Sequence, residues 1–163
     1  MTFRLRTLAP LRFLLVVAFA CPSLAQEPAA PAAPNPKFDA ALAAQVGADE
    51  HGMRSYVLVI LKTGPSRVPD GPERDAMFQG HFANMKRLAG EGKLALAGPL
   101  DGVDGWRGLF VLSVPDIEEA KTLVATDPVV AKGEMVPEFH KYFGSAALML
   151  VNEAHDRVQK KSF

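Results

Sequence analysis

The chain alternates between segments that are apolar at every position and segments that are apolar at every third or fourth position. Residues 54–61 read as a strand whose positions from 56 onward are all apolar, with Tyr56, Leu58 and Ile60 on one face and Val57, Val59 and Leu61 on the other. Residues 108–114 repeat this pattern and predict another such strand. A strand that is apolar on both faces is buried on both faces, so the sequence predicts a sheet that is covered on each side.

Segments with helical spacing separate these strands. Residues 73–89 predict a helix that Gly90 and Gly92 end, with an apolar stripe formed by Phe78, Phe82, Met85 and Ala89. A second helix is predicted from Ile117 to Asp127, with Ile117, Ala120 and Val124 on its buried side; Asp116 and Glu119 cap it, and Pro128 ends it.

The remaining segments complete the pattern. Residues 93–97 predict a strand broken at Gly98-Pro99, followed by a glycine-rich turn around Trp106. Residues 135–143 predict a last strand, which Pro137 places at an edge or bulge. Residues 38–46 form at most a short helix, 145–160 a terminal helix, and the long loop 63–75 is a candidate rim or lid.

The order strand, helix, strand, strand, helix, strand predicts a ferredoxin-like α+β fold with an added C-terminal helix. Two helices cover only one face of such a sheet. The other apolar face needs a partner, and the same face of a second copy is the simplest one. We therefore predict a homodimer with its sheets packed together.

The N-terminus predicts the compartment. Arg4, Arg6 and Arg12 precede a short apolar run at 13–20, and small residues lead to Ala25. This is typical of a secretory signal peptide over 1–25, with cleavage after Ala25 and delivery to the periplasm. Two alternatives remain open, which are lipid attachment at Cys21 and a plain buried N-terminal helix. Only lipidation would bring the protein to a membrane.

Composition restricts the mature protein further. Cleavage would leave 138 of the 163 residues and remove Cys21, the only cysteine, so the mature chain would have neither disulfides nor thiolate metal ligands. The whole chain has 18 basic and 18 acidic residues, and losing the three arginines of the leader gives a net charge of −3. Nothing indicates nucleic-acid binding. We divide the chain into the leader at 1–25, a Pro/Ala-rich linker with a weak helix at 26–52, one domain at 53–144 and an extension at 145–163.

His81 and Asp127 are the candidate catalytic pair. His81 lies on the first predicted helix and Asp127 at the end of the second. An imidazole held by a carboxylate can move protons without metal or cofactor. The alternatives are a histidine that caps local backbone groups and an Asp-Pro turn that merely stops a helix.

The run from His81 to Leu100, which ends Ala97-Gly98-Pro99-Leu100, and the run from Ile117 to Pro128 resemble the YCII-related family in order and spacing. The resemblance covers residues 53–143. It implies a dimeric α+β barrel with an active-site cleft around a His and an Asp, which fall on His81 and Asp127. A few relatives act as cofactor-free dehydrochlorinases of chlorinated hydroxyhydroquinones. The leader, the loop 63–75 and the C-terminal segment depart from the short intracellular pattern, so the resemblance names no substrate for this chain.

Other residues could line the same cleft, or serve only as packing and edge residues: Arg54, Tyr56, Trp106, Arg107 and Tyr142. Gly98 and Pro99 either let backbone amides approach an anion or simply end a strand. The remaining histidines lack zinc-ligand spacing, so we expect no metal site.

Two function classes stay open. One is a cofactor-free lyase or isomerase acting on a small molecule, and the other is a non-catalytic periplasmic binding or interaction module.

Overall fold

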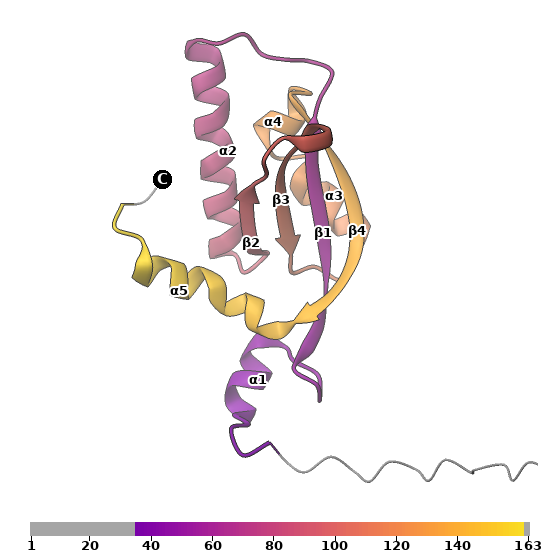
Figure 1. The fold of residues 1–163 in the computed structure, drawn as a ribbon, viewed down its shortest axis with the longest axis vertical. Coiled ribbons are helices and arrows are strands. Elements are labelled where there is room, and N and C mark those ends of the chain that lie inside the picture. Colours follow the sequence, from indigo (N-terminus) through magenta and orange to yellow (C-terminus); the bar gives the residue numbers. More distant parts are fainter. Residues whose placement is uncertain (1–34, 162–163) are drawn as a thin grey trace, which may run out of the picture. The chain divides into compact units, whose positions relative to one another are not determined.

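The computed structural model describes residues 35–161, whose four-stranded antiparallel sheet has the order β2-β3-β1-β4 (Figure 1). The strands are β1 (Met53–Thr63), β2 (Leu94–Pro99), β3 (Trp106–Leu112) and β4 (Met135–Ser145). β1 lies inside the sheet, where Val59 pairs with Phe110 of β3 and Phe139 of β4. This arrangement confirms the predicted ferredoxin-like α+β fold. The predicted signal peptide and Cys21 lie outside the described residues.

Three helices pack on one face of the sheet: α2 (Pro72–Gly90), α3 (Ile117–Val124) and α4 (Pro128–Ala131). Val57, Val59 and Leu61 of β1 point into this layer and are at most 2% exposed. Leu88 of α2 and Val124 of α3 meet them there. Burying each such side chain contributes about 1.5–3 kcal/mol, so this layer is the main core.

The predicted stripe of the long helix is wrong at Phe82. That side chain is 43% exposed, and the buried positions of α2 are Met77, His81, Asn84 and Leu88. The buried face of α2 therefore includes two polar residues, His81 and Asn84. They are tolerated inside because the segment between α3 and α4 supplies hydrogen bonds to them.

Three predicted boundaries also need correction. β2 continues through Gly98 and Pro99, and Trp106 starts β3 instead of lying in a turn. Pro99 fits because β2 is an edge strand, where a missing N–H costs no ladder bond. Pro128 does not only stop the preceding helix, since it is also the first residue of α4.

The long loop before α2 is fastened to the domain. Val68 is 9% exposed and belongs to the core under the helices. The Gly64 N–H donates to the Glu134 carbonyl, and a Cβ on Gly64 would lie 2.0 Å from the Gly133 carbonyl oxygen. The loop therefore lies directly on the backbone before β4, which does not favour the lid interpretation.

The C-terminal segment covers part of the other face of the sheet. It consists of the 3₁₀ turn η2 (Ala146–Leu150) and α5 (Val151–Val158), where the sequence predicts one continuous helix. Figure 1 shows it turning back from β4 toward β2. Leu148 and Met149 pack on a small cluster formed by Tyr56, Ala95 and Val111. The chain itself thus covers part of the face that we assigned to a second copy, and the homodimer stays a prediction.

The N-terminal part of the described chain adds α1 (Ala40–Val46), which Asp39 caps with its carboxylate. The sequence predicts at most a weak helix here, but the side chain of Val46 is buried, with 6% exposed, and so anchors α1 on the domain. Within residues 35–161, no helix is long and apolar enough to cross a membrane.

Candidate functional site

His81 and Asp127 meet because α2 and the start of α4 approach closely. A Cβ on Gly80 would lie 2.9 Å from Pro128 Cγ, which is closer than side chains normally come. Only glycine fits this crossing without a shift. The two motifs Gly80-His81 and Asp127-Pro128 therefore act together, since the glycine and the proline make the contact that places the histidine beside the carboxylate.

The two side chains form a short hydrogen bond. His81 Nδ1 lies 2.7 Å from Asp127 Oδ2, and Asp127 Oδ1 accepts from the Val129 N–H at 3.1 Å. Asp127 is completely buried and His81 is 8% exposed. The carboxylate thus caps α4 and orients the imidazole at the same time. An ionised carboxylate only accepts, so Nδ1 carries the hydrogen and the neutral ring presents Nε2 as a bare acceptor.

Nε2 keeps access to solvent. Among residues 35–161, the only fully buried side-chain nitrogen or oxygen without a hydrogen-bond partner belongs to Asn84. His81 Nε2 is not such an atom, and no hydrogen bond within the described chain engages it. A basic nitrogen with this arrangement can accept a proton from a molecule that reaches it.

Aromatic rings surround the imidazole. Phe110 of β3 stacks on it at 6.0 Å between centroids, and Phe78 meets it edge-on at 6.1 Å. The Phe82 ring lies 5.5 Å away. These rings keep water off most of the imidazole, and their flat apolar walls suit a planar ligand.

Sequence reasoning missed Asn84, one helical turn beyond His81. Its Oδ1 accepts from Arg87 Nη2 at 2.7 Å and lies 3.1 Å from Thr126 Oγ1. Its Nδ2 is the orphan donor mentioned above, and an unsatisfied buried donor costs about 1–3 kcal/mol. The helical spacing of three from His81 was the available signal, but an asparagine normally reads as a surface residue.

Sequence reasoning also missed the ion pair that fastens the long loop. Arg74 Nη2 lies 2.8 Å from Glu134 Oε1, and Glu134 Oε2 accepts from the Val68 N–H at 2.8 Å. The hydrogen bond from Arg74 outweighs burial and lowers the pKa of Glu134, and the same bond raises the pKa of Arg74. The Arg74 guanidinium also lies 4.9 Å from the centroid of the Phe78 ring, so this pair supports one wall of the His81 site.

Two predicted lining residues lie on the opposite face of the sheet. The Arg54 guanidinium donates to the Val46 carbonyl at 2.7 Å and to Ser113 Oγ at 2.8 Å. The Tyr56 hydroxyl donates to the Ser145 carbonyl at 2.9 Å, and burial raises its pKa. The prediction that they line a cleft with His81 is not supported, because alternation along β1 separates them from the helix layer.

The other predicted residues lie on β2, β3 and β4. Gly98 pairs with Leu109, which packs in the Tyr56 cluster, and Arg107 shares that face by strand alternation. Pro99 and Trp106 are exposed near the same end of the sheet. Tyr142 lies with its ring 6.0 Å from that of Tyr56. The structure brings none of these residues into contact with His81 or Asp127.

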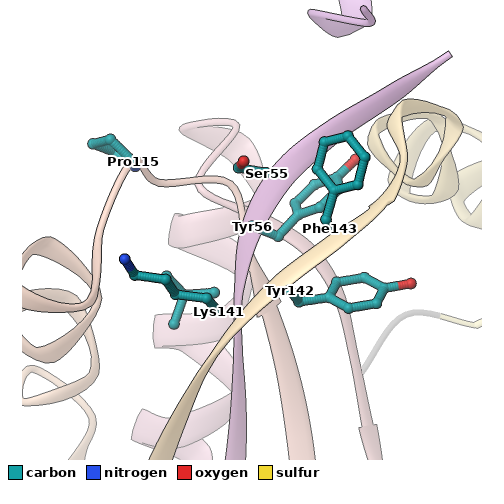
Figure 2. A pocket seen from close by; sticks show the side chains of 7 residues that line it. Ser55, Tyr56, Pro115, Lys141, Tyr142 and Phe143 are labelled. Carbon is teal, nitrogen blue, oxygen red and sulfur yellow. The ribbon is translucent and has the colours of Figure 1, made fainter. Parts of the chain in front are cut away.

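The two described cavities do not include the pair either. One of about 240 Å³ lies along β1 and β4 and is lined by Ser55, Tyr56, Val57, Pro115, Lys141, Tyr142 and Phe143. Figure 2 shows Lys141 extending on the side of Pro115 and Tyr142 on the opposite side of the strands. The second, of about 300 Å³, lies between α1 and α5 and is lined by Leu42, Leu150, Glu153, Ala154 and Arg157. His81 itself keeps a small exposed edge.

Two of the other histidines lie beside a carboxylate. His140 Nε2 lies 2.7 Å from Glu138 Oε1, and His51 Nε2 lies 3.6 Å from Glu50 Oε1. Among residues 35–161, no three His, Cys, Asp or Glu side chains gather in a way that could hold a metal ion.

Comparison with known protein families gives one match. A family model described as the YCII-related domain matches residues 55–137, which is 83 of the 163 residues and includes both His81 and Asp127. No curated protein matches the chain.

Proposed function

The chain belongs to the YCII-related domain family, and on that basis we propose that it is a cofactor-free enzyme in which His81 and Asp127 transfer a proton on a small molecule. The observation that carries the proposal is the 2.7 Å bond between His81 Nδ1 and Asp127 Oδ2 beside an unengaged Nε2. This arrangement gives a base with a defined tautomer in a site that is mostly dry.

The reaction would be an isomerisation or an elimination. His81 Nε2 takes a proton from a carbon or hydroxyl of the substrate, and Asp127 stabilises the imidazolium that forms. The same Nε2 then returns the proton to another position, or a leaving group departs with the electron pair. A positioned proton shuttle contributes roughly 10²–10⁴-fold in rate.

The first test needs no substrate. Nitrogen-15 shifts of the His81 ring report which nitrogen carries the hydrogen in the neutral form. We expect Nδ1–H in the wild type and a shift toward Nε2–H in Asp127→Asn, whose side chain still caps α4. His51→Gln, on an exposed histidine, is the matched control and should leave the His81 signals unchanged. If the His81 tautomer is the same in Asp127→Asn as in the wild type, the proposal is wrong.

The second test is turnover. Solvent deuterium incorporation into chlorinated hydroxyhydroquinones and small ketones would be followed by proton NMR. We expect exchange that is lost in His81→Gln and retained in His51→Gln. Exchange that is equal in both variants would show that another group carries the proton.

We further propose that the mature protein begins after Ala25 and acts in the periplasm, on the strength of the basic and apolar leader. The part of the second sheet face that η2 leaves open carries Leu58, Leu96 and Leu109, which are half-buried. These side chains support association with a second copy, and sedimentation of the mature protein would test it.

One observation favours a second candidate function, a non-catalytic binding module. The cavity along β1 and β4 lies away from the pair and contains Lys141 and the 58% exposed Phe143. A small apolar anion would suit that combination. Ligand binding that depends on Lys141 but not on His81 would favour this alternative.

A further inference from the structure

Asn84 holds a donor that the protein does not use. The side chain is 8% exposed, and its Nδ2 is fully buried without a hydrogen-bond partner within residues 35–161. The orientation of the amide follows from Arg87, because a guanidinium only donates and the atom 2.7 Å from it must be the oxygen. The unused atom is therefore the NH₂ group.

Asn84 lies one turn after His81 on the same buried face of α2, and helical side chains lean toward the preceding turn. The two amide atoms diverge from one carbon, so Nδ2 is turned away from Arg87 and Thr126, which both approach the oxygen. A buried donor with no protein acceptor suits a ligand atom that accepts.

We propose that Asn84 Nδ2 donates to an oxygen of the molecule on which His81 acts, and that this molecule is a carbonyl compound reacting through its enolate. The inference rests on the proposed function and names its substrate class. A primary amide donates through Nδ2 without carrying charge, which suits an oxygen that becomes negative only during the reaction.

The step balances as follows. His81 Nε2 takes a proton from the carbon next to the carbonyl. The electrons of that C–H bond form a carbon–carbon double bond, and the carbonyl π electrons move to oxygen, where Asn84 Nδ2 donates to the enolate. Reprotonation at another carbon gives an isomer, and loss of a β substituent gives an elimination. The flat rings of Phe78 and Phe110 suit the planar enolate.

A phenolate resembles an enolate in shape and charge, so the test uses 4-nitrophenol at a pH where it is ionised. Binding is followed by absorbance and by the NMR signals of the His81 ring. Asn84→Leu removes the donor, and Asn84→Asp keeps an oxygen for Arg87 but replaces the donor with an acceptor. The control is Gln79→Leu, on an exposed position of the same helix.

We expect the wild type and Gln79→Leu to bind the phenolate at His81 with equal affinity. Both Asn84 variants should bind at least about tenfold more weakly, since the bond to the charged oxygen is lost. The His81 tautomer should be unchanged in Asn84→Leu, and melting curves show that each variant is folded. If Asn84→Leu fails to fold, Asn84→Asp still decides the question.

Three results would overturn the inference. They are equal affinity of the Asn84 variants, no phenolate binding at His81 in the wild type, and a crystal structure in which a resident water stays on Nδ2 while the probe is bound. Each of these leaves the proton shuttle standing if the His81 tautomer still depends on Asp127. A tautomer that is independent of Asp127 would instead remove the proposed function itself.

Discussion

Glu134→Gln should destabilise the protein strongly, although Glu134 lies far along the chain from the loop that it holds. The carboxylate is 3% exposed and joins Arg74 and the Val68 backbone, each at 2.8 Å. Arg74 in turn donates to the Val68 carbonyl at 2.9 Å. Losing the charge leaves the guanidinium, whose side chain is 12% exposed, without its main partner.

The magnitude follows from these contacts. Removing one partner of a buried ion pair costs about 3–5 kcal/mol. The lower end applies, because Gln keeps an oxygen that can accept from Val68, and Asp70 remains 3.4 Å from Arg74 Nε. A loss of about 3 kcal/mol lowers the melting temperature of a domain this size by about 10 °C.

The assay is urea unfolding with a matched control. Glu138→Gln makes the same substitution in a surface pair with Lys62, whose side chains are 41% and 35% exposed, and such a pair contributes at most about 1 kcal/mol. Hydrogen exchange of the Val68 amide should accelerate in Glu134→Gln and not in Glu138→Gln. Equal destabilisation by the two substitutions would refute the assigned role of the buried pair.

The pH dependence of stability gives an independent check. The pKa of Glu134 is lowered in the folded protein, mainly by the Arg74 hydrogen bond, from an ordinary value of 4.5. As pH falls below that value, the unfolded chain takes up the proton first, so stability falls until the folded carboxyl also titrates. The contribution is thus present above about pH 4.5 and lost below it. Glu134→Gln should lack this part of the acid-induced loss.

Two further substitutions test other contacts. Gly80→Ala should destabilise the protein by about 1–2 kcal/mol, although alanine is the better helix former, because the new Cβ would meet Pro128; the His81 tautomer should change as well. Gly90→Ala, whose Cβ meets nothing, should instead stabilise the protein by up to about 1 kcal/mol. Melting curves of both variants test this pair of predictions. Asn152→Ala should cost about 1 kcal/mol in urea unfolding by losing its 2.7 Å bond to the Leu94 carbonyl. Gln159→Ala, which loses only a solvent-exposed bond to Asp156, should cost almost nothing.

Periodicity predicted the strands and helices because each is a local property of the chain. It failed where a distant segment decides which face is buried. Helical spacing places Phe82 in the core, yet it is 43% exposed. The neighbouring His81 is buried instead, because Asp127, which lies 46 positions away, forms a hydrogen bond with the imidazole. The break predicted at Gly98-Pro99 failed for a similar reason, since only the sheet order shows that β2 is an edge.

The site shows the same limit. The distance between His81 and Asp127 needed the close crossing at Gly80, which no local pattern reveals. Tyr56 lies in a strand that is apolar on both faces, so the sequence did not show which face the helices cover. No local pattern marks Glu134 and Arg74 as buried, because their burial depends on a contact between positions 60 residues apart.

The position of β1 has a consequence for how the chain folds. Its two neighbours, β3 and β4, are both made later, and β4 is joined to it across most of the domain. Such long-range pairing slows folding, because a large loop must close before the contacts form. Until Met135–Ser145 has been made, β1 exposes an unpaired edge beside an apolar surface, and such edges invite pairing with other chains. A nascent chain of this protein is therefore expected to need protection from aggregation until its last strand is available.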